Sequence, residues 1–231
     1  MPSVFVVVAA YNEADRIGAT LAALGEAFPD ALVWVADDGS SDRTAEIARA
    51  AGAHVVRSER VVGKGGAMTS ATRAAHSRAR ESSFQNMQSA VFLLCDGDLA
   101  ESARALDVLV AAIGTGDADI AVAAFAKRIG GGVGLALGFA RWAIRARCGL
   151  ETRAPISGQR ALSAKALENV LPFAHGYGME IGMTIDAVRG GHRLVEVDMD
   201  LSHRASGRTL RGFAHRGRQL VDFVRVYLAR R

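Results

Sequence analysis

The sequence predicts a single α/β domain in which a mostly parallel sheet is covered by helices on both faces. Short apolar segments alternate with segments whose apolar residues recur at helical spacing, and this alternation is typical of such a fold. A chain of 231 residues, 50% of them hydrophobic, is long enough to bury one continuous core. The 25 glycines and only 4 prolines suit many tight turns between strands and helices.

The first half of the chain shows the alternation clearly. Residues 4–10 and 90–95 are apolar throughout, as expected of strands that are buried on both faces. Ile17, Leu21 and Leu24 begin a helical stripe. The expected elements are strands at 4–10, 32–36, 54–57 and 90–95, and helices at 17–28, from Ser40 or Ser41 to 51, and at 64–80.

The second half of the chain is less regular. Residues 194–201 alternate apolar with acidic side chains, which predicts a strand. The other expected elements are strands at 119–123 and 157–162, a flexible stretch from Gly130, an amphipathic segment around 139–144, a helix at 178–188, and a final long helix.

Polar clusters follow three of the predicted strands at the point where each strand ends. They are Tyr11-Asn12-Glu13, Asp37-Asp38-Gly39-Ser40 and Asp96-Gly97-Asp98. The carboxyl ends of parallel strands lie at one edge of a sheet, and ligands bind there. Asp, Asn and Gly also favour ordinary turns, but three such clusters at successive strand ends favour one shared site.

Asp96 and Asp98 are candidate ligands of a divalent metal. Two carboxylates separated by one glycine, directly after a buried strand, suit Mg²⁺ or Mn²⁺. Such an ion offsets the negative charge that builds on a diphosphate leaving group. His203, after the last predicted strand, is a candidate third ligand, although a single histidine is more often structural.

Three further residues are candidates for the same site. Asp38 either binds a nucleotide base or ribose or caps the next helix. Lys64 opens a helix within Gly63-Lys64-Gly65-Gly66-Ala67, which lacks the P-loop spacing but places a cation and free N–H groups where a phosphate can bind. Glu180, an acid among apolar and small residues, either orients or deprotonates an acceptor hydroxyl or pairs with an arginine.

Positive charge is concentrated in the C-terminal tail. Residues 201–231 hold eight arginines and one acid, Asp222, so this tail has a net charge of +7. The whole chain has a net charge of +4, so the first 200 residues sum to −3. A nucleic-acid-binding protein with a basic body is therefore disfavoured, and no nucleic-acid partner is expected.

Two faces are predicted on the final helix. Arg211, Arg218 and Arg225, with His215, oppose an apolar stripe made by Leu210, Phe213, Leu220, Val224 and Tyr227. Either the helix packs on the domain with its arginines in solvent, or it makes a peripheral contact with an anionic membrane. The segment from Phe139 to Ile144, beside Arg141 and Arg145, is a candidate second contact or a lid over the acceptor.

The predicted compartment is the cytoplasm. The apolar run at 4–10 is followed at once by polar residues, unlike a signal peptide, and no apolar segment has the length of a membrane span. Cys95 and Cys148 match no metal-ligand spacing and are expected to be reduced, buried thiols. We expect a protein that is either free in the cytoplasm or peripheral to the inner face of the membrane.

Taken together, the motifs resemble those of the family 2 glycosyltransferases. The segments 8–13, 36–44, 63–67 and 95–98 occur in the order and rough spacing of that family. Residues 157–161, Ser-Gly-Gln-Arg-Ala, resemble the acceptor-side motif of polyprenyl- and dolichyl-phosphate sugar synthases. Residues 176–182 with His203-Arg204 resemble glucosyl-3-phosphoglycerate synthases. The Gln-x-x-Arg-Trp motif of polysaccharide-making members is missing, which argues against a processive synthase.

The resemblance implies a GT-A type, Rossmann-like fold and a particular domain organisation. It implies a glycosyltransferase domain at 1–207, with a nucleotide-binding half at 1–99 and an acceptor half at 100–207, followed by a basic amphipathic helix at 208–231. It further implies that Glu180 and Asp98 act in catalysis, with Glu180 on the acceptor side. The residues implied to border the donor are Ala10, Tyr11, Glu13, Asp38, Lys64, Gly65 and Asp96, and those implied to hold the metal are Asp96, Asp98 and His203.

The implied activity is metal-dependent transfer of a hexose from a UDP- or GDP-sugar to an acceptor hydroxyl or phosphate. A polyprenyl phosphate and a small soluble acceptor are alternative acceptors. A sugar nucleotidyltransferase is disfavoured because Ala-Tyr-Asn-Glu stands where a glycine-rich loop is expected. An inactive nucleotide-binding module is disfavoured because Asp96, Asp98 and Glu180 are all present. The sugar, the anomeric outcome, and the choice between monomer and homodimer stay open.

Overall fold

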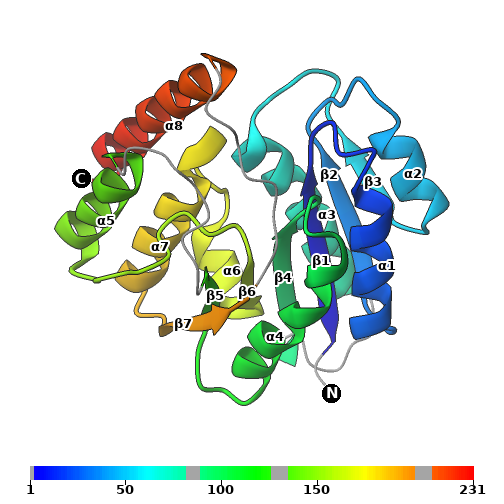
Figure 1. Cartoon of the computed structure of the whole chain (residues 1–231). Coiled ribbons are helices and arrows are strands. Elements are labelled where there is room, and N and C mark those ends of the chain that lie inside the picture. Colours follow the sequence, from blue (N-terminus) through cyan, green and yellow to red (C-terminus); the bar gives the residue numbers. More distant parts are fainter. Residues whose placement is uncertain (1–2, 82–88, 126–134, 201–209) are drawn as a thin grey trace.

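A computed structural model of the chain describes residues 3–81, 89–125, 135–200 and 210–231, with the backbone alone at 125 and 210–218. Its centre is a seven-stranded sheet with the strand order β3-β2-β1-β4-β6-β5-β7. Helices cover both faces of the sheet, and the C-terminal helix α8 lies at the end opposite α1 and α2 (Figure 1). The predicted α/β class is therefore confirmed.

The first half of the chain supplies four parallel strands. Its elements are β1 (Val4–Ala10), α1 (Ile17–Ala27), β2 (Leu32–Asp37), α2 (Thr44–Ala50), β3 (His54–Arg57), α3 (Lys64–Glu81) and β4 (Val91–Asp96). Strands β2 and β4 flank β1, and β3 pairs with the outer side of β2. Ala10 lies opposite Asp37 and Ala9 lies opposite Asp96, so the polar residues after these strands share one edge of the sheet.

The second half adds three strands, one of them reversed. Its elements are η2 (Ala100–Leu106), α4 (Asp107–Gly114), β5 (Ile120–Phe125), α5 (Leu135–Cys148), β6 (Arg160–Ser163), α6 (Ala164–Val170), η3 (Gly176–Gly178), α7 (Met179–Arg189), β7 (Leu194–Met199) and α8 (Leu210–Ala229). Strand β6 is antiparallel to both β4 and β5, whereas β7 is parallel to β5. Arg160, which begins β6, pairs with Leu94 near the end of β4, so the segment before β6 reaches the same edge.

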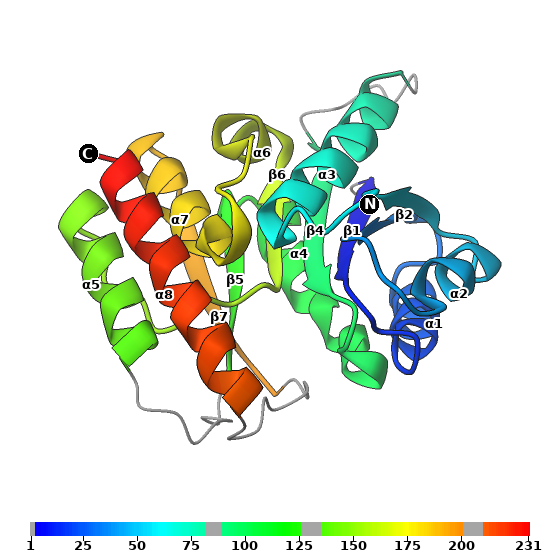
Figure 2. The same cartoon turned by 90° about the horizontal axis from the view of Figure 1, so that it is seen from above.

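Three groups of buried apolar side chains hold the layers together. On one face of the sheet, α1, η2 and α4 pack through residues such as Ile17. On the other face, α3, α6 and the start of α7 pack through residues such as Met68. Helices α5 and α8 lie side by side outside α7, where Ile144, Ile181 and Phe223 are buried together (Figure 2).

All seven predicted strands are present, but several helices differ from the prediction. Helices α4 and α6 were not predicted, because elements of eight and seven residues are too short for a clear periodic pattern. Helix α2 begins at Thr44 because the serines before it bond to Asn12 instead of capping the helix. Asn12 N donates to Ser40 Oγ at 2.9 Å, and Ser41 N donates to Asn12 Oδ1 at 2.8 Å.

The face of α8 that packs on the domain is not the predicted apolar stripe. Phe223 and Val226 are buried against α5 and α7, whereas Leu220 and Val224 are 38% and 37% exposed. In the part of the chain that the structure describes, no helix combines the length and the apolar character needed to cross a bilayer. The stretch predicted from Gly130, the side chains at 210–218 and His203 lie outside the described residues.

Candidate active site

The tight turn after β4 carries the two candidate metal ligands. Gly97 lies between Asp96 and Asp98, and its N–H donates to the carbonyl oxygen of Ala9 at 2.8 Å. A Cβ added to Gly97 would lie 3.0 Å from that oxygen, so a larger residue would push the turn away from β1. The hydroxyl of Thr20 donates to Gly97 O at 2.8 Å. Helix α1 therefore fixes the turn that presents both carboxylates.

Lys64, the first residue of α3, bridges two carboxylates from distant parts of the chain. Its Nζ lies 2.6 Å from Asp96 Oδ1 and 2.8 Å from Glu180 Oε1. Burial lowers the pKa of Lys64, but the two neighbouring carboxylates outweigh this effect and hold the pKa well above its usual range. The edge of the sheet therefore carries an ammonium group held between two acids, both of which were predicted to belong to the site.

Gln159 and Gly158 close this cluster from the side of β6. Gln159 Nε2 donates to Asp96 Oδ2 at 2.8 Å, so both oxygens of that carboxylate have a partner. The backbone of Gly158 packs directly against the ion pair, because an added Cβ would lie 2.6 Å from Lys64 Nζ and 2.7 Å from Asp96 Oδ2. Neither residue was predicted as part of the site, although the acceptor-side motif at 157–161 contains both.

A fully buried arginine ties this segment to the helix that carries Glu180. Arg160 Nε donates to Ser157 O at 2.8 Å, and its Nη1 donates to Thr184 Oγ1 at 2.9 Å. The Thr184 hydroxyl donates in turn to Glu180 O at 3.0 Å. Burial lowers the pKa of Arg160 to about 10, while Glu180 and Glu196 oppose the shift. Arg160 thus keeps the Gly158 segment and helix α7 in a fixed relationship.

Asp38 fastens the loop that leads into Lys64. Its Oδ1 accepts a hydrogen bond from Val62 N at 2.7 Å, and its Oδ2 accepts one from Gly63 N at 3.0 Å. Burial raises the pKa of Asp38, and these two N–H groups act in the opposite direction. Asp38 therefore has a structural task in the loop, and its contact with a nucleotide base stays a prediction.

The other residues predicted to border the nucleotide-sugar donor lie at the same edge of the sheet. Ala10 is buried at the end of β1, and Tyr11 is 50% exposed beyond it. Glu13 N donates to Thr44 Oγ1 at 2.8 Å, which joins this loop to the start of α2. Gly65 is required for packing, because an added Cβ would overlap the carbonyl oxygen of Ala174.

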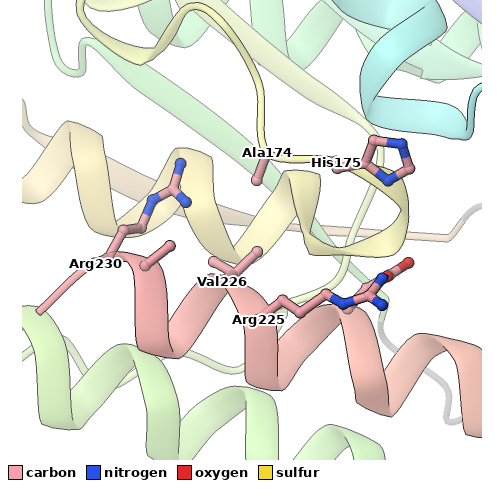
Figure 3. Close-up of a pocket in the computed structure, with 7 residues that line it drawn as sticks. Ala174, His175, Arg225, Val226 and Arg230 are labelled. Carbon is pink, nitrogen blue, oxygen red and sulfur yellow. The ribbon is translucent and has the colours of Figure 1, made fainter.

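Helix α8 packs on η3, the turn that leads into Glu180. Glycines permit this approach, because a Cβ added to Gly176 would overlap Asp222 and one added to Gly178 would overlap Val226. A cavity of about 170 Å³ lies between α8 and residues 174–175, which lead into this turn (Figure 3). Its lining residues are Ala174, His175, Asp222, Arg225, Val226, Ala229 and Arg230.

The described residues include oxygen donors of the type that a divalent cation prefers. Asp96 and Asp98 place carboxylate groups on one tight turn, and Mg²⁺ and Mn²⁺ prefer oxygen ligands of this kind. Within the described ranges, no group of three His, Cys, Asp or Glu side chains is placed to hold a metal. The third predicted ligand, His203, lies outside those ranges.

Comparison with known proteins decides the family. The model of glycosyl transferase family 2 matches residues 5–170, a stretch that includes Asp38, Lys64, Asp96 and Gln159. The chain belongs to glycosyl transferase family 2. It is therefore an enzyme that transfers a sugar, as its motifs predicted.

Two kinds of proteins resemble this transferase over nearly its whole length. The undecaprenyl-phosphate mannosyltransferase of Micrococcus luteus is 29% identical over 244 residues, which cover 99% of this chain and 95% of that protein. The structure of glucosyl-3-phosphoglycerate synthase from Mycobacterium tuberculosis with Mn²⁺, UDP-glucose and glycerol 3-phosphate gives a TM-score of 0.70 at 26% identity, over 99% of this chain and 80% of that one.

The same synthase with Mn²⁺, UDP and phosphoglyceric acid gives a TM-score of 0.73 at 26% identity, over 99% of this chain and 78% of that one. The motifs predicted a likeness to both polyprenyl-phosphate sugar synthases and glucosyl-3-phosphoglycerate synthases. Both resemblances are confirmed. The GT-A type fold expected from them is confirmed by the structural match.

Proposed function

We propose that this family 2 glycosyl transferase moves a hexose from a UDP- or GDP-sugar to the phosphate of a polyprenyl phosphate. The observation that carries the proposal is the ion-pair cluster in which Lys64 lies between Asp96 and Glu180. A fixed cation suits a reaction in which the leaving diphosphate and the attacking phosphate are both anions. The match to an undecaprenyl-phosphate mannosyltransferase over 95% of its length supports this class of acceptor.

In the proposed reaction, the bond between the anomeric carbon and the diphosphate oxygen breaks, and its electron pair leaves with the diphosphate. An oxygen of the acceptor phosphate supplies the electron pair of the new bond. A phosphate monoester loses its second proton with a pKa of about 6, so it needs no base at neutral pH. This agrees with the position of Glu180, whose side chain is 6% exposed and paired with Lys64. Glu180 then holds Lys64 in place and does not remove a proton.

Asp96 and Asp98, with His203, are the residues that would hold the divalent metal. Bound Mn²⁺ or Mg²⁺ would offset the charge of the diphosphate leaving group. We assign Lys64 to the diphosphate as well, because its ammonium group contacts the same carboxylate, Asp96, at 2.6 Å. The remaining donor contacts are assigned to Ala10, Tyr11, Glu13, Asp38 and Gly65.

A small soluble acceptor of the phosphoglycerate type is the second candidate. The similarity to glucosyl-3-phosphoglycerate synthase, at a TM-score of 0.70 over 99% of the chain, favours it. A hydroxyl nucleophile has to lose its proton during transfer, so this reaction needs a base. In the described site, Glu180 would have to leave Lys64 to serve as that base.

The test is a transfer assay with labelled UDP- and GDP-sugars and Mn²⁺. Each sugar is offered with a short polyprenyl phosphate in detergent or with 3-phosphoglycerate. We expect label to enter the lipid, and we expect the variant Asp98→Asn or added EDTA to abolish this transfer. Asp30→Asn, at an exposed site far along the chain from the turn, is the matched control. Transfer to phosphoglycerate alone would establish the second candidate, and transfer to neither acceptor would overturn both.

A further inference from the structure

Helices α5 and α8 lie side by side (Figure 2). Apolar side chains on both helices face solvent there. On α8, Leu220, Val224 and Leu228 recur every four residues and are 38%, 37% and 47% exposed. On α5, Trp142 is 51% exposed, and its ring centroid lies 4.7 Å from that of Tyr227 on α8. These five side chains form one patch across both helices, which we call the α5–α8 face.

The two helices that carry the α5–α8 face contain more basic than acidic residues. Helix α5 contains three arginines and no acid, and α8 contains four arginines and one acid, Asp222. The side chain of Asp222 is only 14% exposed, whereas those of Arg145 and Arg225 are 70% and 74% exposed. Arg145 pairs with Glu151, which lies beyond the end of α5, and Arg225 pairs with Asp222. The two helices themselves therefore offer solvent arginines and apolar side chains.

We propose that the α5–α8 face docks on an anionic lipid bilayer. Apolar side chains on a basic helix enter the region between headgroups and acyl chains, while arginines attract anionic headgroups. This inference rests on the proposed function, because a polyprenyl phosphate resides in a membrane. It combines the two membrane contacts predicted from the sequence, one on the final helix and one near Trp142, into a single surface.

A second copy of the chain fits this surface less well than a bilayer does. In a two-fold symmetric dimer, the same patch of each protomer meets its copy. Arginines of α5 and α8 would then face arginines, and like charges across an interface are unfavourable. An anionic membrane instead places negative headgroups opposite Arg145 and Arg225.

The helix that carries most of the α5–α8 face also packs against the turn that leads to Glu180. Helix α8 contacts η3, where Gly178 packs against Val226. Glu180 lies in the first turn of α7, directly after η3. The proposed membrane contact and the contact with η3 therefore lie on different sides of the same helix, α8.

Vesicle sedimentation tests the proposal. We expect the full chain to sediment with phosphatidylglycerol vesicles at least tenfold more than with phosphatidylcholine vesicles, and less as salt is raised. The triple variant Leu220→Ser, Val224→Ser, Leu228→Ser should lower sedimentation at least tenfold, and Trp142→Ser should lower it independently. Val108→Ser, at a 44% exposed apolar residue on α4, is the matched control and should sediment as the wild type does.

Two results would overturn the docking proposal. One is a folded wild-type chain that does not sediment with anionic vesicles. The other is unchanged sedimentation of both the triple variant and Trp142→Ser. A wild-type dimer in light scattering that the triple variant splits, without vesicle binding, would assign the face to a second copy instead.

Transfer assays separate this inference from the proposed function. With a short polyprenyl phosphate in detergent, the triple variant should turn over as the wild type does, because no bilayer is needed. With the acceptor embedded in vesicles, it should lose at least tenfold in rate. Transfer in detergent without vesicle binding would defeat the docking proposal alone. Vesicle binding by a chain that glycosylates only phosphoglycerate would support docking and defeat the proposed acceptor.

Discussion

The carboxylate of Asp222 accepts a hydrogen bond from the backbone N–H of Tyr177 at 3.1 Å. Tyr177 is the middle residue of η3, and α7 begins directly after it with Glu180 in its first turn. The C-terminal helix therefore holds the turn that delivers Glu180 to Lys64. Asp222 thus helps to position the ion pair between Glu180 and Lys64, although it lies more than forty positions after Glu180 in the chain.

Asp222→Ala should lower kcat by about tenfold, because losing a hydrogen bond to a charged group costs roughly 1.5–3 kcal/mol and loosens η3. Steady-state kinetics measure the effect, and we expect a smaller change in KM for the donor. Asp222→Asn keeps an acceptor oxygen and should recover most of the rate. With the acceptor in detergent, Arg225→Ala removes only the exposed partner at 3.4 Å and should keep the wild-type rate. Equal loss in the Ala and Asn variants would argue against the positioning role.

Lys64→Gln should lower kcat by on the order of 10²-fold, the usual effect of removing one fixed group that stabilises developing charge. The same change leaves Asp96 and Glu180 without their shared cation, so the melting temperature should also fall. Lys165→Gln, at an exposed lysine on α6, is the matched control. Wild-type turnover by Lys64→Gln would remove Lys64 from the reaction.

The raised pKa of Lys64 predicts that deprotonation of this residue does not lower the rate or the stability at moderately alkaline pH. A lysine whose folded pKa lies above its unfolded value of about 10.4 stabilises the fold fully below that pH. The stabilisation disappears only as pH rises through the folded pKa. Wild-type rate and stability, measured from neutral pH to about pH 10, should show no step from Lys64. A step near pH 8 that Lys64→Gln removes would contradict the ion-pair geometry.

Gly158→Ala should reduce activity by tenfold or more, about 1.4 kcal/mol in the barrier, because the new methyl group displaces Lys64 Nζ or Asp96 Oδ2. Gly25→Ala is the control, since its added Cβ meets nothing within 4 Å. That helix-interior change should stabilise the fold by roughly 0.5–1 kcal/mol. Steady-state kinetics and thermal melting of both variants test this prediction. Full activity in Gly158→Ala would show that the reaction tolerates a displacement of Lys64 or Asp96.

Asp38→Ala should weaken UDP or GDP binding by on the order of 1–3 kcal/mol, because buried polar partners lose their acceptor. Part of the loss would arise from the loop, since Val62 N and Gly63 N both donate to this carboxylate. Isothermal calorimetry measures the affinity, with Asp30→Ala as the exposed control. Unchanged affinity would leave Asp38 with its structural task alone.

The strands and the three polar clusters were predictable because their signals are local. A buried strand such as β4 is a short apolar run, and the residue that ends it, Asp96, is visible in the same run. The partnership of Lys64 with Asp96 and Glu180 needed the sheet order to be known. Gln159 could not be found from periodicity, because its place depends on the reversed direction of β6.

The buried face of α8 was not predictable for a related reason. Which side chains it buries depends on Gly176 and Gly178, which let the helix approach η3 closely. Periodicity along α8 detects apolar residues on more than one side and does not say which side meets the domain. Phe223 and Val226 meet the domain, and Leu220 and Val224 face outward.

Because β6 runs antiparallel to β4, two separate parts of the chain meet at one edge of the sheet. The chain reaches the sheet edge before it enters β6, so the stretch at 149–159 comes to this edge from a later part of the chain than the loops after β1, β2 and β4. Its last residues, Gly158 and Gln159, pack against Asp96. The stretch is also anchored on β7, where Glu196 accepts from Arg153 N and Ala154 N, each at 2.9 Å. Substitutions in the part of this stretch before Gly158 can therefore alter this edge of the sheet without changing the loops that follow β1, β2 and β4.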